Sequence, residues 1–122
     1  MDNFRFFAEV IDDVVTRVLT VHSNEMLNDD GVEQESLGQA FLNNLFGESN
    51  WVLCSNDGFR KQFPILGSTF NSVENIFIGP QPYGSWTLDA NFDWQPPTPM
   101  PTDGKIYVWF EPNRVWIEIV EP

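Results

Sequence analysis

Two similar segments in the C-terminal third constrain the fold of this chain more than any other feature. In Ser85–Trp94 and in Tyr107–Trp116, a Trp is followed two or three positions later by an acidic residue, then by a short polar turn and a second Trp. The segment between them, Gln95–Gly104, contains four prolines, which exclude a helix and disfavour a central strand. We therefore predict two small tryptophan-bearing hairpins joined by a stiff proline strap.

The distribution of proline separates two kinds of sequence within the chain. All nine prolines of the 122 residues lie at or after Pro64, so regular strands and a helix are expected before it, and short strands, turns and straps after it. The length predicts a single domain, residues 1–122. Within it we expect a hairpin–helix–hairpin half over residues 1–65 and a half rich in Pro and Trp over residues 66–122.

The first half begins with a predicted hairpin. Residues with high strand propensity fill Phe4–Ile11 and Val14–Val21, and Asp12-Asp13 between them is typical of a turn. Trp51–Ser55 and Phe59–Ile65 flank an Asn-Asp-Gly sequence, which predicts a second hairpin.

One amphipathic helix is predicted over Val32–Phe46, and Gly47 supplies its C-terminal stop. Asp29 or Asp30 is expected to cap its N-terminus. Its apolar stripe comprises Leu37, Ala40, Phe41, Leu42, Leu45 and Phe46.

A further short pair of extended segments is expected at Phe70 and at Ile76–Ile78. Together these elements predict an α+β fold. Antiparallel β-hairpins carry one helix packed on the N-terminal sheet, and proline-strapped Trp hairpins lie at the C-terminus.

The charge balance restricts the classes of molecule that this chain is expected to bind. The 18 acidic and 6 basic residues give a formal net charge of −12, which disfavours binding to nucleic acid or to an anionic membrane surface. No run of apolar residues is long enough to cross a bilayer, and the N-terminus lacks the pattern of a secretory signal. We expect a protein made in the cytoplasm, with a solvated acidic surface.

The sequence offers no recognisable catalytic set, so we expect no enzymatic activity and no cofactor. Cys54 follows an apolar run and is expected to be a small buried residue. His22, the sole histidine, is expected to be exposed or to cap a turn. The chain has one His and one Cys, too few ligands for a zinc site. The acidic residues near Asn28 lack the spacing of a calcium-binding loop, so we predict no metal site.

The aromatic residues of the second half are the candidate interface. They would either line an exposed face that stacks on sugar rings, or pack internally and clamp the proline straps, with one or two at a protein interface. We prefer the second alternative, because Trp and Tyr bury large areas. The candidate binding residues are Tyr83, Trp86, Trp94, Tyr107, Trp109 and Trp116.

An ordered series of motifs resembles a family of short proteins encoded by tailed phages, notably those of marine cyanobacteria. The segments 14–15, 45–47 and 51–52 are also similar to that family, so the resemblance covers most of the chain, while 56–64 and 71–75 depart from it. The motifs that carry it are Gly67–Phe70, Ile76–Tyr83, Ser85–Asp89, Trp94–Pro99, Asp103–Lys105 and Tyr107–Trp109.

The resemblance implies a virion-associated or structural protein and implies no catalytic residues. We therefore expect a non-enzymatic virion component, either a capsid decoration or cement protein or a tail or neck accessory, that binds a major capsid or tail protein. Formation of a homo-oligomer is also compatible with this expectation. The alternatives are a soluble acidic phage effector that binds a host protein, and a glycan-binding module that uses exposed Trp residues.

Overall fold

The strand-forming residues near the N-terminus build the longest hairpin of the protein. In the computed structural model, which describes residues 3–120, strand β1 (Phe4–Ile11) pairs antiparallel with β2 (Val14–His22). Asp12 and Asp13 both have positive φ, 51° and 67°, as a tight two-residue hairpin turn requires. The predicted first hairpin is confirmed.

Three shorter strands complete a curled five-stranded sheet. β3 (Trp51–Cys54) pairs with β1, β4 (Thr69–Asn71) pairs with β2, and β5 (Ile76–Ile78) pairs with β4, all antiparallel. The order across the sheet is β3-β1-β2-β4-β5, which places β3 and β5 at its two edges. The extended pair expected around residues 71–75 is confirmed.

Both faces of the sheet are buried, which explains why adjacent residues of β1, Phe7 and Ala8, are both fully inaccessible. One face packs against the helix and the other lies inside the curl of the sheet. The helix side contains Phe7, Val21, Met26, Leu42 and Trp51. The inner side contains Ala8, Val10, Val15, Val52, Cys54, Phe70 and Phe77.

The helix is shorter than predicted at its start. After a 3-10 turn, η1 (Ser23–Met26), helix α1 (Glu35–Phe46) begins at the cap residue Gln34, whose side chain makes no capping hydrogen bond. The prediction that Asp29 or Asp30 caps it is wrong. Both lie in a turn held by Asn28, whose Oδ1 accepts the backbone N–H groups of residues 30 and 32. The predicted stop at Gly47, with φ 93°, is confirmed.

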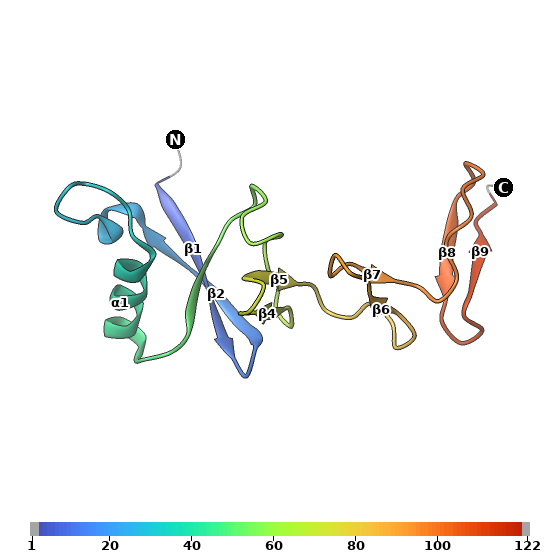
Figure 1. The fold of residues 1–122 in the computed structure, drawn as a ribbon, viewed down its shortest axis with the longest axis horizontal. Helices are drawn as coiled ribbons and strands as arrows, with labels where there is room; N and C mark the ends of the chain where they lie inside the picture. The colour runs from blue at the N-terminus through green and yellow to red at the C-terminus, as the bar shows by residue number, and fades with distance from the viewer. Residues whose placement is uncertain (1–2, 121–122) are drawn as a thin grey trace. The chain divides into compact units, whose positions relative to one another are not determined.

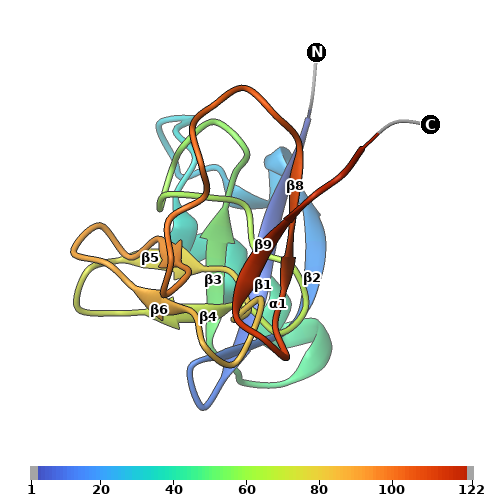
Figure 2. The same ribbon diagram turned by 90° about the vertical axis from the view of Figure 1, so that its right-hand side faces the viewer.

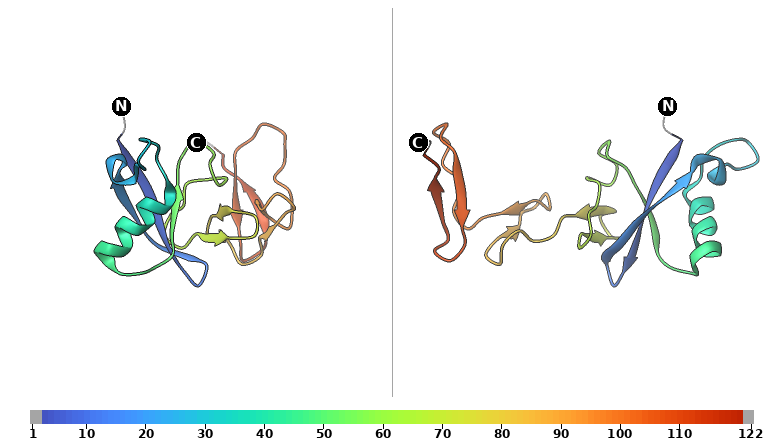
Figure 3. Two further views of the ribbon diagram at one scale, coloured as in Figure 1. Left: turned by 60° about the vertical axis from the view of Figure 1, so that its left-hand side comes forward. Right: turned by 180° about the vertical axis from the view of Figure 1, so that it is seen from behind.

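The buried stripe of α1 also differs from the prediction. Helix α1 packs on the part of the sheet formed by β3, β1 and β2, on the side away from β4 and β5 (Figure 1 and Figure 3). Gly38 and Leu42 are its buried residues, whereas Leu45 and Phe46 are more than half exposed. The reason is steric, since a Cβ built on Gly38 would lie 2.8 Å from Cε1 of Phe7. The missing side chain lets this line of the helix approach β1 most closely.

The predicted strand over Phe59–Ile65 is wrong. The outer edge of β3 is instead occupied by side chains: Glu35 accepts the Leu53 N–H, Gln39 donates to the Trp51 carbonyl, and Arg60 donates to the Leu53 carbonyl. Because these backbone groups are already satisfied, no further strand pairs there.

Arg60 also joins the two edges of the curled sheet. Its guanidinium contacts Glu35 in two hydrogen bonds of 2.9 and 3.2 Å and donates to Asn75 Oδ1 at 2.9 Å. Its own carbonyl accepts the N–H of Phe77 in β5. One residue with positive φ therefore bridges α1, β3 and the β4–β5 pair.

The second half contains the two predicted Trp hairpins. β6 (Thr87–Leu88) pairs with β7 (Trp94–Gln95), and β8 (Tyr107–Phe110) pairs with β9 (Val115–Glu118), as Figure 2 shows for the longer pair. The α+β class with β-hairpins and one helix is confirmed. Residues 66–80 join the first sheet, so the chain forms two compact units that divide after Pro80 and not after residue 65.

Candidate functional site: the tryptophan cluster

The two Trp hairpins use their acidic residues in different ways. In the first, Asp89 Oδ1 accepts the backbone N–H groups of Asn91 and Asp93, and its Oδ2 accepts Gln95 Nε2. Asp89 therefore holds the short polar turn that was predicted between the two arms of this hairpin. Phe92 has φ 62°, the left-handed conformation that closes the turn.

In the second hairpin the acidic residue links the two Trp segments. Glu111 accepts three hydrogen bonds: from Ser85 N at 2.9 Å, from Ser85 Oγ at 2.7 Å and from Trp109 Nε1 at 2.8 Å. These bonds, with those from Ser85 contributing most, hold the pKa of the Glu111 carboxyl below its usual value. The position of Glu111, two residues after Trp109, was the only indication of this link in the sequence. Its long-range partner Ser85 was not predicted.

Three Trp rings and one Tyr ring pack together. The centroids of Trp86, Trp109 and Trp116 lie 5.9, 6.2 and 5.1 Å apart, and each pair meets edge to face. Tyr83 lies 5.6 Å from Trp86. Edge-to-face packing places the positive edge of one ring on the negative face of the next. We call Tyr83, Trp86, Trp109 and Trp116 the tryptophan cluster.

The register of β8 and β9 creates this cluster. Trp109 and Trp116 are direct cross-strand partners, so both rings project from the same face of the hairpin. Trp109 is 8% exposed, which fits the internal role that we preferred for it. In the first hairpin, by contrast, Trp94 pairs with Leu88, and Trp86 lies just before the strand.

The proline strap is bound to the cluster by an indole. Trp116 Nε1 donates to the carbonyl of Thr98, in the middle of the strap, at 2.8 Å. A strap rich in proline offers carbonyl acceptors but few N–H donors, so indole N–H groups suit it. The expectation that Trp residues hold the straps is therefore confirmed for Trp116.

A pocket of about 470 Å³ opens between the cluster and the strap. Trp86, Trp94 and Trp116 form its aromatic walls, and none of its lining residues is ionisable. We call it the Trp–Pro pocket. Its lining residues are Trp86, Trp94, Gln95, Pro96, Pro97, Pro99, Met100 and Trp116.

Tyr107 is the one candidate residue that lies in neither the tryptophan cluster nor the pocket lining. Its hydroxyl donates to Asp103 Oδ2 at 2.8 Å, near the end of the strap. This bond raises the pKa of Tyr107 to about 12 and lowers the pKa of Asp103. Tyr107 therefore positions the segment that leads into β8.

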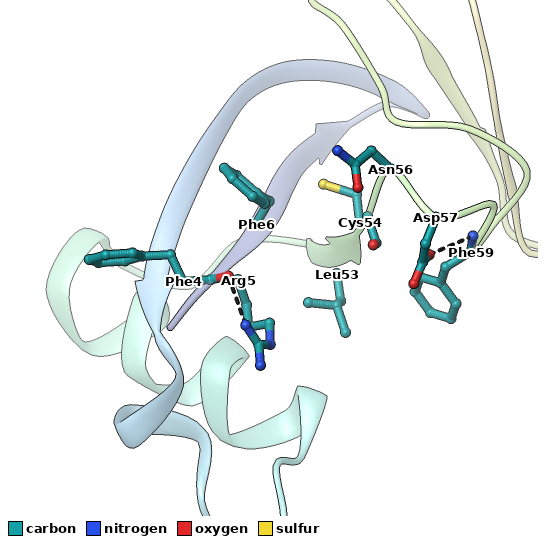
Figure 4. A pocket seen from close by; sticks show the side chains of 9 residues that line it. Phe4, Arg5, Phe6, Leu53, Cys54, Asn56, Asp57 and Phe59 are labelled. Carbon is teal, nitrogen blue, oxygen red and sulfur yellow. Dashed lines mark hydrogen bonds between the residues drawn. The ribbon is translucent and has the colours of Figure 1, made fainter. Parts of the chain in front are cut away.

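A second pocket, of about 490 Å³, lies in the first unit beside β1 and β3 (Figure 4). Its ionisable side chains are engaged locally: Arg5 binds Glu33 through two nitrogens, and Asp57 accepts the Phe59 N–H. Cys54 is buried, as expected, and burial raises the pKa of its thiol to about 12, so little thiolate forms near neutral pH.

The remaining sequence predictions concern His22, metals and membranes. His22 Nδ1 accepts the Asn24 N–H at 3.1 Å, so the predicted capping role is confirmed. Within residues 3–120, no three His, Cys, Asp or Glu side chains are grouped as a metal site would need. Over the same residues, no helix has the length and apolar character needed to span a membrane.

Comparisons with protein families, with curated proteins and with solved structures found no match to this chain.

Proposed function

We propose that this chain is a non-enzymatic structural protein of a tailed-phage virion and that it binds a major capsid or tail protein through the Trp–Pro pocket. The observation that carries the proposal is the chemistry of that pocket. Its walls are indole, proline and methionine side chains, and glutamine is its only polar lining residue. Such a lining fits an apolar or proline-bearing segment of another protein better than a charged substrate.

The arrangement of the Trp residues supports a binding role in addition to a structural one. Trp109 is buried within the cluster, whereas Trp86, Trp94 and Trp116 are partly exposed at the pocket walls. Trp is one of the residues enriched among those that dominate protein interfaces. One wall of the pocket is also pre-formed, because the Thr98 carbonyl fixes the indole of Trp116 through its N–H group. Little side-chain entropy is then lost on binding.

The resemblance to short phage proteins supplies the expected context, in which the partner is a virion protein and the acidic surface faces outward. The test is quantitative mass spectrometry of purified particles of the phage that encodes the chain. We expect a fixed copy number in wild-type particles. Trp94→Ala should lower that number at least about tenfold, because truncating a central interface Trp costs about 2–4 kcal/mol.

The matched control is Val73→Ala, which truncates an exposed apolar residue remote in sequence from the pocket lining. It should leave the copy number unchanged, and the soluble level of both variants should equal that of the wild type. Absence of the wild-type chain from particles would contradict the proposal. Recovery with a host protein from infected cells would then favour the acidic effector. Quenching of Trp fluorescence by host polysaccharide would favour glycan binding.

A further inference from the structure

The β8–β9 hairpin has two chemically different faces. Strand alternation and the cross-strand register place Tyr107, Trp109 and Trp116 on one face, toward the tryptophan cluster. The opposite face carries three cross-strand pairs of apolar residues, each 41–59% exposed. These six residues, which we call the apolar hairpin face, are Ile106, Val108, Phe110, Val115, Ile117 and Ile119.

The six side chains form an ordered patch. Phe110 lies opposite Val115 and Val108 opposite Ile117, and the Ile119 N–H donates to the Ile106 carbonyl at 2.8 Å, which continues the pairing. At their observed exposures they leave on the order of 500 Å² of apolar surface in one patch, near the upper end for a typical monomer. A two-stranded sheet with one uncovered apolar face is marginally stable in water, and a second layer would bury that face.

The charge of the hairpin differs from that of the chain. Residues 105–119 contain two basic and two acidic residues and so carry no net charge, although the whole chain carries −12. Lys105 and Glu118 lie 3.9 Å apart, which balances charge at one end of the hairpin. Two copies of an acidic protein therefore meet the least electrostatic repulsion if they approach through this segment.

We propose that the apolar hairpin face packs against the same face of a second copy, which forms a symmetric dimer with two two-stranded sheets stacked face to face. A two-fold contact needs a self-complementary surface, and a flat patch of β-branched residues and one Phe meets that need. About 500 Å² from each copy gives about 1,000 Å² in total, the lower limit for a specific interface. The dimer should accordingly be weak and dependent on concentration.

This inference does not depend on the proposed function. The Trp–Pro pocket uses Trp116, which projects from the other face of the hairpin, so a dimer formed in this way leaves the lining residues of the pocket outside its contact. The proposal is that a second copy of this chain covers the apolar hairpin face. An apolar segment of another protein is the competing occupant and is an outcome of the test.

The experiment is sedimentation equilibrium of the full chain from about 1 µM to about 1 mM, the range in which an interface of this size is expected to associate. We expect the average mass to rise from 14.1 kDa toward twice that value. The double variant Val108→Thr/Ile117→Thr keeps strand propensity but removes apolar surface from both copies. Its dissociation constant should rise at least about 100-fold, because four apolar side chains are lost per dimer.

Val73→Thr makes the same kind of change at a residue that is 91% exposed outside the hairpin, and it should leave the dissociation constant unchanged. Near-UV circular dichroism of the Trp109–Trp116 pair reports whether the double variant keeps its hairpin. Hydroxyl-radical footprinting of the unmodified protein needs no variant: labelling of Phe110 and Ile117 should fall as concentration rises, while Val73 stays constant. A wild type that stays monomeric up to 1 mM overturns the proposal and favours an apolar segment of another protein as the occupant of this face. A dimer whose footprint spares the hairpin overturns it as well.

Discussion

The two compact units of this protein are stabilised in different ways. Of the fourteen buried hydrophobic residues other than proline among those the structure describes, thirteen lie in the first unit, and twelve of these form two clusters on the two faces of one curled sheet. The second unit contributes only Trp109. It depends instead on edge-to-face ring contacts and on hydrogen bonds from side chains to the backbone and to Glu111.

The two units also differ in the backbone and apolar groups that they present to another chain. The first unit buries a core on both faces of its sheet and satisfies the outer edge of β3 with side chains, so that edge offers few free backbone groups to another strand. The second unit is held together by a few directed contacts and keeps apolar groups accessible, in the Trp–Pro pocket and on the apolar hairpin face. Each contact in the second unit should consequently carry a larger share of its stability.

The largest expected effect is that of Trp109→Ala. Trp109 contacts two other indoles and donates to Glu111, so its removal should cost about 3–5 kcal/mol. We expect the loss to appear in the second unit: limited proteolysis should cleave after residue 80 while the first unit stays resistant. The measurement is urea unfolding followed by circular dichroism, together with mass mapping of the proteolytic fragments.

Phe7→Ala provides the reciprocal variant. Phe7 is fully buried between α1 and the sheet, so a similar cost is expected, but with cleavage before Pro80. A loss below about 0.5 kcal/mol for Trp109→Ala would show that the aromatic cluster does not stabilise the second unit.

The next largest effect is expected for Arg60→Met. The change keeps the length of the side chain but leaves Glu35 and the Leu53 carbonyl without their donor at the sheet edge. Breaking this partly buried network should cost about 2–3 kcal/mol. Arg5→Met is the control, because Arg5 also binds a carboxylate through two nitrogens but at a more exposed site, where less than about 1 kcal/mol is expected. Equal costs in urea unfolding would rule out a special role for Arg60 in closing the sheet.

The sequence predicts the elements whose signals are local. The hairpin at Asp12 and Asp13, the stop at Gly47 and the turn at Asp89 each depend on residues that are close together along the chain, and all three are confirmed. The same holds for the existence of the two Trp hairpins, since strand pattern and turn chemistry agree there.

The failed strand prediction and the link from Glu111 that was not predicted both involve partners far apart in sequence. Phe59–Ile65 has the composition of a strand, but Glu35, 18 residues before Leu53, already accepts the backbone N–H that a new strand would need. Similarly, the link from Glu111 to Ser85 spans 26 residues. No local pattern of charge or hydrophobicity reveals such partners.

Gly38→Ala should have a smaller effect, because two terms oppose each other. Alanine favours the helix by about 1 kcal/mol, but its Cβ would meet the ring of Phe7, which cannot move freely because it is fully buried. Overpacking of this kind costs about 1–3 kcal/mol, so we expect a net loss of up to about 2 kcal/mol in thermal or urea unfolding. The control is Ala40→Gly at an exposed position of the helix, which measures the difference in helix propensity between Ala and Gly without any contact to Phe7. Gly31→Ala is unsuitable, because Gly31 has φ 76° and Ala would be strained there. A stabilised Gly38→Ala variant would show that α1 has room to move away from β1.

The smallest expected effect is a pH dependence specific to the second unit. The folded-state pKa of Glu111 is lowered by its bonds with Ser85 and Trp109, so its contribution to stability is present above the unfolded pKa of about 4.5 and is lost as pH falls through the folded pKa. The NMR shift of the Trp109 indole proton should follow this titration, with a midpoint below 4.5, because that proton is donated to the carboxylate. The indole proton of Trp116 is donated to the Thr98 carbonyl, which does not titrate, and it serves as an internal control. In Glu111→Gln the Trp109 shift should become independent of pH over this range. A Trp109 titration that persists in that variant would assign it to another carboxyl and would remove Glu111 as the link between the two hairpins.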